Sequence, residues 1–525
     1  MIPVPGFEGR RIAVFGLGRS GITAARALKA GGARPVLWDD SVSSRMQAQA
    51  EGFDVEDLTV ADWSGFAALV LSPGAPLTHP VPHWTVVKAA EAGVPVIGDI
   101  ELFARAIAAL PQADRPKVVA ITGTNGKSTT TALIGWVLQQ AGLTVHVGGN
   151  IGIGVLALPG FRERGPSGPP TDGGQEADLK VRAPAKAVYV IEVSSYQLDL
   201  TTSFAPDVAI LTNISPDHLD RHGGMDGYVA AKARLFQALG PQAVALVGTD
   251  ENWGRTLARD LAAAGHRVTT VSTSVQPREG GDPGLRDRTG IAGAADGHAV
   301  TGYGAKAWVP AFAGMHGIGA GDGVLKVEGE PDLDLSTARS LPGRHNAQNA
   351  AFAWGAARAL GVPREVAAKG LMTFPGLAHR MEPVATLGAV RFINDSKATN
   401  TDAARQALLS YPSVFWIAGG RAKTGGIDDL ADLFPRVARA YLIGEAAPDF
   451  ARTLSGVSHQ ISGDMAAAVA QAAADAAEVA ETDGPQVVLL SPAAASFDQY
   501  HDFEARGEAF RAAVLALGAT PAASA

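Results

Sequence analysis

The feature that most constrains the fold is a series of short apolar runs that alternate with helical patterns along most of the chain. The clearest runs read RIAVF, ALVLS, KVVAIT, AVYVIE, DVAILT, VFWIAGG and QVVLLS. Their apolar residues do not alternate with polar ones, which is typical of strands buried on both faces. Strands that are separated by helices predict parallel, doubly wound sheets. The sequence therefore predicts an α/β protein.

The runs are too many to share one sheet comfortably, and two polar, proline-containing stretches divide them. These stretches, at 110–117 and 340–346, have the composition of linkers. We therefore predict three α/β domains, at 1–112, 113–340 and 341–525. The first and third are expected to be Rossmann-like, and the second to be a P-loop-type ATPase domain.

Two stretches rich in Gly, Pro and charge interrupt the second domain, at about 161–185 and 272–323. They lack clear periodicity, which predicts surface insertions. Their order and role stay open at this point. We expect a chain without Pro277–Met315 to fold and to remain active.

Composition excludes several classes of protein. The 525 residues include 52 acidic and 44 basic ones, and a net charge of −8 argues against a general nucleic-acid binder. There is no cysteine, which excludes disulfides and thiolate metal ligands and fits a cytoplasmic location. No apolar run is long enough to span a bilayer. We therefore predict a cytoplasmic protein without nucleic-acid partner or membrane insertion.

A first glycine loop lies near the start of the chain, where RIAVF runs into a G-x-G-x-x-G motif at Gly16–Gly21. Such glycines let the backbone approach a diphosphate that faces a helix N-terminus. Taken with Asp39 beyond the next apolar run, the motif alone also permits an NAD(P)-dependent oxidoreductase. That alternative leaves the second glycine loop unexplained.

The second glycine loop, in KVVAITGTNGKSTTTALIGW, joins an apolar run to an amphipathic helical pattern. Lys127 would supply a positive charge for the β- and γ-phosphates of a nucleotide, and the Ser128 hydroxyl is a natural Mg²⁺ ligand. The strict P-loop pattern fails, because its first glycine would fall at Ile121. The order of strand, turn, lysine and hydroxyl nevertheless favours a nucleotide site over an ordinary capped turn.

Further polar residues follow other apolar runs. Glu192 ends one run, and His218 comes shortly after another. The carboxyl ends of parallel strands face one crevice, so both side chains can converge on phosphates held by Lys127. Oxygen ligands suit Mg²⁺, whereas imidazole is a less usual ligand. Lys232, by its helical pattern alone, is interpreted as a solvated lysine.

The last third of the chain carries cationic and hydroxyl side chains at or near the ends of apolar runs. They are Arg380, Lys397, Lys423 and Ser496. Side chains of these types suit recognition of phosphate and carboxylate groups.

Taken together in order, the motifs are far more specific than any single glycine loop. They read TGTNGKST, GNIG, EVSSYQL, NISPDHLDRH, AAK, HNAQNA, HRME, NDSKATN and SPAAASFDQY. The chain thereby resembles the ATP-dependent Mur ligases of peptidoglycan synthesis. The resemblance implies three domains, for a UDP-sugar, ATP and an amino acid, in a monomeric enzyme. It implies ATP and two Mg²⁺ ions, and a reaction through an acyl phosphate.

The resemblance also suggests substrates. The stretches SPGAPLTHP, GDIELF, NDSKATN and SPAAASFDQ favour UDP-N-acetylmuramoyl-L-alanine and D-glutamate. Another Mur ligase and a ligase like folylpolyglutamate synthase remain alternatives with the same chemistry. A non-catalytic P-loop switch protein is an alternative from a different class.

The resemblance implies roles for residues that match the family's motifs. Catalytic residues are Lys127, Glu192, His218 and Lys232. The implied metal ligands are Ser128, Glu192, His218 and, as a carbamate, Lys232. The implied ATP contacts are Gly123, Thr124, Asn125, Gly126, Lys127, Ser128, Thr129, Asn346, Asn349, Arg380, Asp395 and Lys397. The implied UDP-sugar contacts are Gly16, Leu17, Gly18, Arg19, Ser20, Asp39, Ser72, Pro73, Gly74, Asn150 and His218. The implied D-glutamate contacts are Thr399, Lys423, Ser496, Phe497 and Phe503.

Two departures from the family's pattern leave contacts open. The family often has an arginine shortly after the acidic residue at the position of Asp39, but here the next arginine is Arg45. The uracil contacts at that corner are therefore unassigned. The loop GGRAKTGG, which contains Lys423, also differs from the family's usual Asp- and Gly-rich form.

Overall fold

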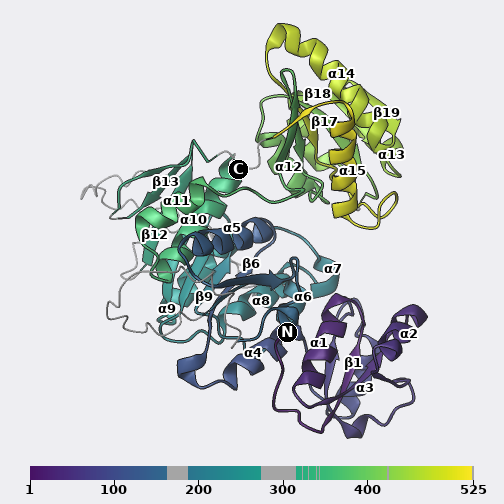
Figure 1. The fold of residues 1–525 in the computed structure, drawn as a ribbon, viewed down its shortest axis with the longest axis vertical. Coiled ribbons are helices and arrows are strands. Elements are labelled where there is room, and N and C mark those ends of the chain that lie inside the picture. The colour runs from purple at the N-terminus through teal and green to yellow at the C-terminus, as the bar shows by residue number, and fades with distance from the viewer. Residues whose placement is uncertain are drawn as a thin grey trace, which may run out of the picture.

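The computed structural model describes residues 1–161, 187–273 and 315–522, apart from 322, 329, 339, 342, 423 and 424. These residues form three successive α/β units, each built on its own sheet, with the third unit at the top of Figure 1 and the first at the bottom. The predicted three-part α/β fold is thus confirmed. None of the described helices is long and apolar enough to cross a membrane.

The first unit (1–97) is a five-stranded parallel sheet in the order β3-β2-β1-β4-β5. Its strands are β1 (Arg11–Phe15), β2 (Arg34–Trp38), β3 (Asp54–Val55), β4 (Phe66–Leu71) and β5 (Val96–Ile97). Its helices are α1 (Arg19–Ala30), α2 (Val42–Ala50) and α3 (Trp84–Glu91). The strand order reverses beside β1, so the first glycine loop lies at the switch point where open sheets bind ligands.

Helix α4 (Asp99–Ala108) joins the first unit to the second. Its Glu101 carboxylate accepts hydrogen bonds from the backbone N–H groups of Thr202 and Ser203, both at 2.9 Å. Phe103 packs against Tyr189 of the second unit, with ring centroids 5.7 Å apart. One continuous hydrophobic core therefore spans both units through this helix.

The second unit (117–374) has a nine-stranded sheet in the order β14-β13-β12-β11-β10-β9-β6-β8-β7. The strands are β6 (Lys117–Thr122), β7 (Val145–Gly149), β8 (Val188–Glu192), β9 (Val208–Leu211), β10 (Val244–Gly248), β11 (Arg267–Ser272), β12 (Met315–Gly321), β13 (Val324–Val327) and β14 (Leu333–Asp334). The helices are α5 (Lys127–Gln140), α6 (Ser195–Asp199), α7 (Leu219–His222), α8 (Met225–Ala233), α9 (Asn252–Ala263), α10 (Arg344–Ala359) and α11 (Arg364–Met372). Strands β6 to β12 run parallel, so the loop after β6 and the ends of β8, β9 and β10 lie at one edge of the sheet.

Strand β12 corrects one sequence expectation. The predicted insertion at 272–323 ends in a strand, because Met315–Gly321 pairs in parallel with β11. Glycine is uncommon in strands, so β-propensity does not predict a strand here. The strand nevertheless forms, and its Ile318 and Ala320 are buried in the core of the unit. Residues 274–314 of that insertion, and 162–186 around the other, lie outside the described residues.

Helices α10 and α11 pack onto the second sheet together with α5. Phe352, Trp354 and Leu371 are buried in the same core as Val119 and Ile134. The predicted boundary at 340 thus falls inside this packing unit. We propose that the boundary lies between Phe374 and Glu382, because β15 opens the third sheet there.

The third unit (382–522) has a seven-stranded sheet in the order β19-β18-β17-β20-β16-β15-β21. Its strands are β15 (Glu382–Leu387), β16 (Val390–Asn394), β17 (Val414–Gly419), β18 (Val437–Ile443), β19 (His459–Gly463), β20 (Gln486–Leu490) and β21 (Thr520–Pro521). Its helices are α12 (Thr401–Leu409), α13 (Ala447–Thr453), α14 (Met465–Asp483) and α15 (Phe503–Ala516). The five strands from β16 to β19 are parallel, so the loops after β16, β17 and β20 meet at one edge.

Candidate active site

The second glycine loop connects β6 to α5, and the structure leaves no room for a larger residue at its Gly126. Gly126 has a φ of 81°, and a Cβ there would lie 2.6 Å from Asn349 Oδ1. The close approach of α10 therefore requires glycine at this position. Helix α5 begins at the next residue, Lys127, so its N-terminal N–H groups are available to an anion.

The Lys127 side chain folds back over this loop. Its ammonium donates hydrogen bonds to the carbonyls of Gly123 at 2.9 Å and Thr124 at 2.7 Å. Burial lowers the pKa of this lysine, and the nearby charge of Glu192 opposes that effect. The loop therefore holds a cation where the sequence predicts phosphates.

Lys232 lies on α8 and is only 1% exposed, so its interpretation as a solvated lysine is wrong. Its Nζ donates a hydrogen bond to the same Gly123 carbonyl at 2.8 Å and lies 4.4 Å from the centroid of the Tyr228 ring. Burial lowers the pKa of Lys232 well below its ordinary value, and the charge of Lys127 lowers it further. Two lysines thus share one carbonyl in a buried site.

Glu192 ends β8 and is 2% exposed. Its Oε1 accepts a hydrogen bond from Asn150 Nδ2 at 3.0 Å, whereas its Oε2 is buried without a hydrogen-bond partner. A buried carboxylate oxygen left without a partner is rare, and it is a suitable Mg²⁺ ligand. The charge of Glu192 acts on Lys127, which adjoins the buried Ser128 hydroxyl. Glu192 and Ser128 therefore fit the predicted metal site.

His218 caps α7 with a left-handed backbone, at a φ of 54°. Its side chain is 41% exposed, and its Nε2 lies 3.4 Å from Asp217 Oδ2. The charge of Asp217 acts on both Lys127 and Lys232, so this turn borders the lysine pair. Among the described residues, no three His, Asp or Glu side chains are grouped as a metal site by themselves.

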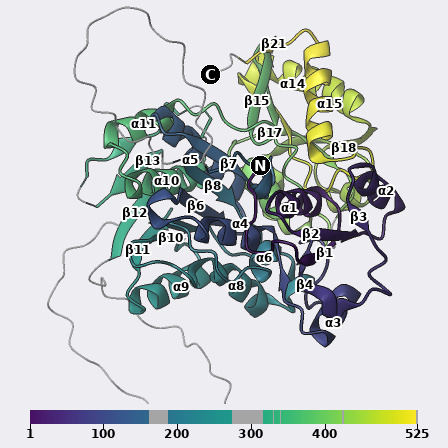
Figure 2. The ribbon, with the colours of Figure 1, turned by 60° about the horizontal axis from the view of Figure 1, so that its bottom comes forward.

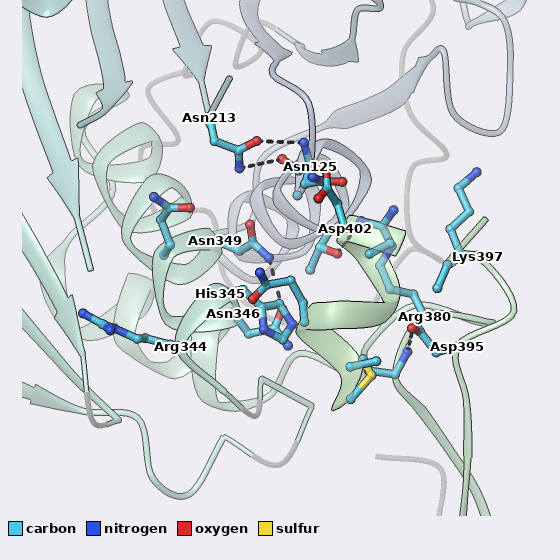
Figure 3. A pocket seen from close by; sticks show the side chains of 18 of the residues that line it. Asn125, Asn213, Arg344, His345, Asn346, Asn349, Arg380, Asp395, Lys397 and Asp402 are labelled. Carbon is cyan, nitrogen blue, oxygen red and sulfur yellow. Dashed lines mark hydrogen bonds between the residues drawn. The ribbon is translucent and has the colours of Figure 1, made fainter. Parts of the chain in front are cut away.

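A cavity of about 350 Å³ lies between the second and third units, beside the glycine loop (Figure 3). Most of the predicted ATP contacts line it: Asn125, Gly126, Thr129, Asn346, Asn349, Arg380, Asp395 and Lys397. The structure adds residues that the sequence analysis missed: Asn213, Asp250, Glu251, His345, Gln348 and Asp402. The rule about strand ends could have found Asn213, Asp250 and Glu251, since they follow β9 and β10 closely.

Arg380, Asp395 and Lys397, near the start of the third unit, line this cavity (Figure 3). Arg380 Nη1 donates a hydrogen bond to Thr129 Oγ1 on α5 at 2.9 Å, which joins the two units. Asp395 accepts hydrogen bonds from Ser491 Oγ and the Met381 N–H group, and burial raises its pKa to about 7. Burial lowers the pKa of Lys397 to about 8.

The first glycine loop packs against the turn that follows β4. A Cβ at Gly16 would lie 2.5 Å from Ser72 Cβ, so the two loops are in direct contact. Asp39 accepts hydrogen bonds from the N–H groups of Leu17 at 2.6 Å and Ser41 at 2.8 Å. Arg45 donates to the Asp39 carbonyl and stacks over Trp38, so an arginine reaches this corner from α2.

Two arginines bridge the first and second units near the predicted UDP-sugar contacts. Arg19 Nη1 donates to the Gly152 carbonyl at 2.8 Å, close to Asn150. Arg221 of α7 donates to the carbonyls of Gly74 and Pro73, at 3.0 and 3.3 Å. The predicted UDP-sugar residues therefore lie along the boundary between these units.

The predicted D-glutamate residues differ in their burial. Ser496 is buried after β20, and Phe503 begins α15 with its ring 3.7 Å from the Lys397 ammonium. Thr399 follows Lys397 on the same loop. Phe497 is 65% exposed. Lys423 lies outside the described residues.

Together, the fold and the site define a class of protein. A glycine loop with a lysine at the start of its helix, in the middle one of three α/β units, fits an ATP-dependent ligase that joins an acid to an amine. Comparison with protein families agrees: residues 121–288 match the Mur ligase middle domain, and 379–494 match the Mur ligase, glutamate ligase domain.

Known proteins place the chain more narrowly. A protein from Caulobacter sp. (strain K31) named UDP-N-acetylmuramoylalanine--D-glutamate ligase is 55% identical, over 99% of this chain and 98% of its own. One of the same name from Nitrobacter hamburgensis is 49% identical over 100% of both chains. The fold is similar to that of a Thermotoga maritima UDP-N-acetylmuramate-alanine ligase, with a TM-score of 0.52, 15% identity, and coverage of 97% and 99% of the two chains. The chain belongs to the Mur ligase family, and the predicted resemblance is confirmed.

Proposed function

We propose that this chain joins D-glutamate to UDP-N-acetylmuramoyl-L-alanine with the hydrolysis of ATP, in the cytoplasmic synthesis of peptidoglycan precursors. The observation that carries this proposal is the identity of about half of all residues, over the full length, with ligases of that name. The geometry supports it, because the cavity borders the loop of Lys127 through Asn125, Gly126 and Thr129.

The chemistry has two balanced steps. The alanyl carboxylate attacks the γ-phosphorus of ATP, which forms an acyl phosphate and releases ADP. The D-glutamate amine then attacks the acyl carbon, which forms the amide and releases phosphate and a proton. Two anions must meet in the first step, so positive charge at the loop stabilises its transition state. Lys127 and the N–H groups at the start of α5 supply this charge on the ATP side.

The cavity offers a path for the rest of the nucleotide. Asn346 and Asn349 of α10 approach the loop from one side, and Arg380, Asp395 and Lys397 from the other. The last three belong to the chain segment that opens the third unit, so ATP would contact two units at once. Ser128, Glu192, His218 and a carbamylated Lys232 would hold two Mg²⁺ ions, which would neutralise phosphate charge.

Lys232 is suited to carbamylation by its surroundings. Its neutral amine can add to CO₂, which forms a carbamate and releases a proton. Burial favours that neutral amine. The carbamate exchanges a positive charge beside Lys127 for a negative one, so repulsion between two lysines on one carbonyl becomes attraction.

The UDP-sugar and D-glutamate subsites are assigned by the positions of the predicted residues. The first glycine loop, Asp39 and the Ser72–Gly74 turn would hold the UDP end of the sugar, and Asn150 and His218 its reacting end. Thr399, Lys423, Ser496, Phe497 and Phe503 would hold D-glutamate. We propose that the enzyme acts as a monomer.

Isotope transfer tests this proposal. The substrate is labelled with ¹⁸O in its alanyl carboxylate, and the products are analysed by mass spectrometry. We expect one ¹⁸O atom in the released phosphate and a product heavier by one glutamyl residue. Amide formation with unlabelled phosphate would contradict the acyl phosphate.

A further inference from the structure

Arg221 spans the boundary between the first and second units in a way that the proposed chemistry does not use. It lies on α7, only three residues after His218. Its guanidinium donates hydrogen bonds to the backbone carbonyls of Gly74 at 3.0 Å and Pro73 at 3.3 Å. Both acceptors belong to the turn after β4 of the first unit. The two donors are Nη1 and Nη2, which the planar guanidinium holds at a fixed separation, whereas an ammonium has a single donor atom.

The guanidinium also stacks on an aromatic ring. Its Cζ lies 4.5 Å from the centroid of the Tyr196 ring, which places the cation over the aromatic face. Its Nε is buried without a hydrogen-bond partner, so the stacking and the two carbonyl contacts define its position. Tyr196 itself is the second residue of α6, four positions after Glu192.

A second set of contacts fixes α7 to α6. His222 Nε2 lies 3.0 Å from Ser195 Oγ, and His222 Nδ1 lies 3.1 Å from Asp199 Oδ2. The His222 ring stacks on Tyr196 at an angle of 17°. The Tyr196 ring is therefore in contact with both Arg221 and His222, and α7 cannot turn without breaking these contacts.

The turn that Arg221 holds is itself coupled to the first glycine loop. The Ser72 N–H group donates to the Phe15 carbonyl at 2.9 Å, and Ser72 leaves no room for a side chain at Gly16. On the other side, the Arg221 N–H group donates to the His218 carbonyl at 3.1 Å. A short, rigid path thus runs from Gly16, through Ser72–Gly74 and Arg221, to His218. Figure 2 shows α6 beside the strands of the first unit.

We propose that Arg221, stacked on Tyr196, is a positioning residue that sets the distance between the two ends of the UDP-sugar site. This inference rests on the proposed function, because it takes the first glycine loop as the diphosphate end and His218 as the reacting end. Arg221 acts through the Pro73–Gly74 turn and contributes nothing to the ATP cavity. Its loss therefore weakens binding of one substrate and leaves the other two unaffected.

Steady-state kinetics of four variants test the proposal. In Arg221→Met, we expect the KM for the UDP-sugar to rise by about tenfold or more, with the KM values for ATP and D-glutamate within about twofold of the parent's. Arg221→Lys should show most of the same loss, since it keeps the charge without the fork. Tyr196→Phe should behave as the parent because the ring remains, whereas Tyr196→Leu should resemble Arg221→Lys.

A matched control separates positioning from general stability. Arg115 also donates to two backbone carbonyls, those of Ala108 and Leu110, but away from this turn. Arg115→Met should leave all three KM values unchanged. An unchanged KM for the UDP-sugar in Arg221→Met and Tyr196→Leu, or an equal rise in all three KM values, would overturn the inference.

Calorimetry with the UDP-sugar alone distinguishes this failure from failure of the proposed function. The parent should bind it, and Arg221→Met should bind it about tenfold more weakly at an unchanged melting temperature. A parent that does not bind this sugar refutes the proposed function. Equal binding by the parent and Arg221→Met refutes only the role of Arg221.

Discussion

At the scale of single residues, the sequence analysis succeeded where chemistry is tied to a strand end. Glu192 ends β8 and is buried, and Lys127 begins α5 five residues after the end of β6. The sequence analysis failed for Lys232, because the burial of a lysine on a helix depends on which other parts of the chain pack against that helix. The ring of Tyr228 lies on the same helix, four residues before Lys232, but the carbonyl of Gly123 belongs to a loop 109 residues away in the sequence. A lysine's local pattern carries no information about such a distant partner.

The buried lysine gives the first prediction. Lys232→Ala should lower kcat by at least about 10²-fold, because the site loses an anionic metal ligand. Added acetate or propionate should partly restore activity by occupying the space left behind. The control is Lys117→Ala, which removes an exposed lysine that pairs with Asp207. Full activity of Lys232→Ala without added carboxylate would show that no carbamate is needed.

Lys397 gives a prediction about pH. Burial lowers its pKa to about 8, so its ammonium form is present below that pH and is lost above it. The KM for ATP should therefore rise between pH 8 and 9.5 in the parent. In Lys397→Arg the guanidinium stays charged, so its KM for ATP should remain flat over that range. Parallel profiles for the two proteins would rule out Lys397 as the titrating group.

At the scale of elements, the apolar runs predicted the parallel strands of all three sheets well. The exceptions are β3, β7, β11 and β19, which carry none of the predicted runs, and β12 with the edge strands next to it. Residues 315–321 include three glycines, so neither propensity nor an apolar run marks a strand. Pairing with β11 and burial of Ile318 create it, and both depend on the folded sheet.

Strand β12 changes the expectation about deleting Pro277–Met315. Strands β11 and β12 are parallel, so the chain between them must cross back to the edge of the sheet at which β11 begins. Such a crossover needs about a dozen residues, and this deletion leaves too few. We now expect it to lower the melting temperature by roughly 5 °C or more and to expose the core beside Ile318.

A milder deletion is the control. Removing only 285–307 keeps more than a dozen connecting residues and spares Met315. This variant should melt as the parent does and keep its activity, as measured by calorimetry and phosphate release. Equal stability of the two deletions would show that β12 contributes little to the unit.

At the scale of the whole molecule, the three-part architecture was predictable, but the limits of the parts were not. Helix α4 precedes the predicted boundary at 112 and yet shares a core with the second unit, through Phe103 and Tyr189. Helix α10 follows the predicted boundary at 340 and packs on α5. Linker composition marks where a chain can bend. Packing decides which unit each helix joins, and that is settled only by tertiary contacts.

The candidate site also depends on tertiary contacts between units. Arg380 comes from the start of the third unit and reaches Thr129 of the second, while Arg221 of the second reaches Gly74 of the first. Each boundary between neighbouring units is therefore crossed by an arginine of the later unit. A single motif such as G-x-G-x-x-G cannot reveal this arrangement, and it is why the first glycine loop alone also permitted an oxidoreductase.

The most direct test of the account measures phosphate release by the purified full-length protein with each substrate omitted in turn. We predict turnover only when ATP, UDP-N-acetylmuramoyl-L-alanine and D-glutamate are all present. We predict none when L-glutamate, L-lysine or a folate replaces its counterpart. Turnover with one of these replacements, or none with the full set, would contradict the account.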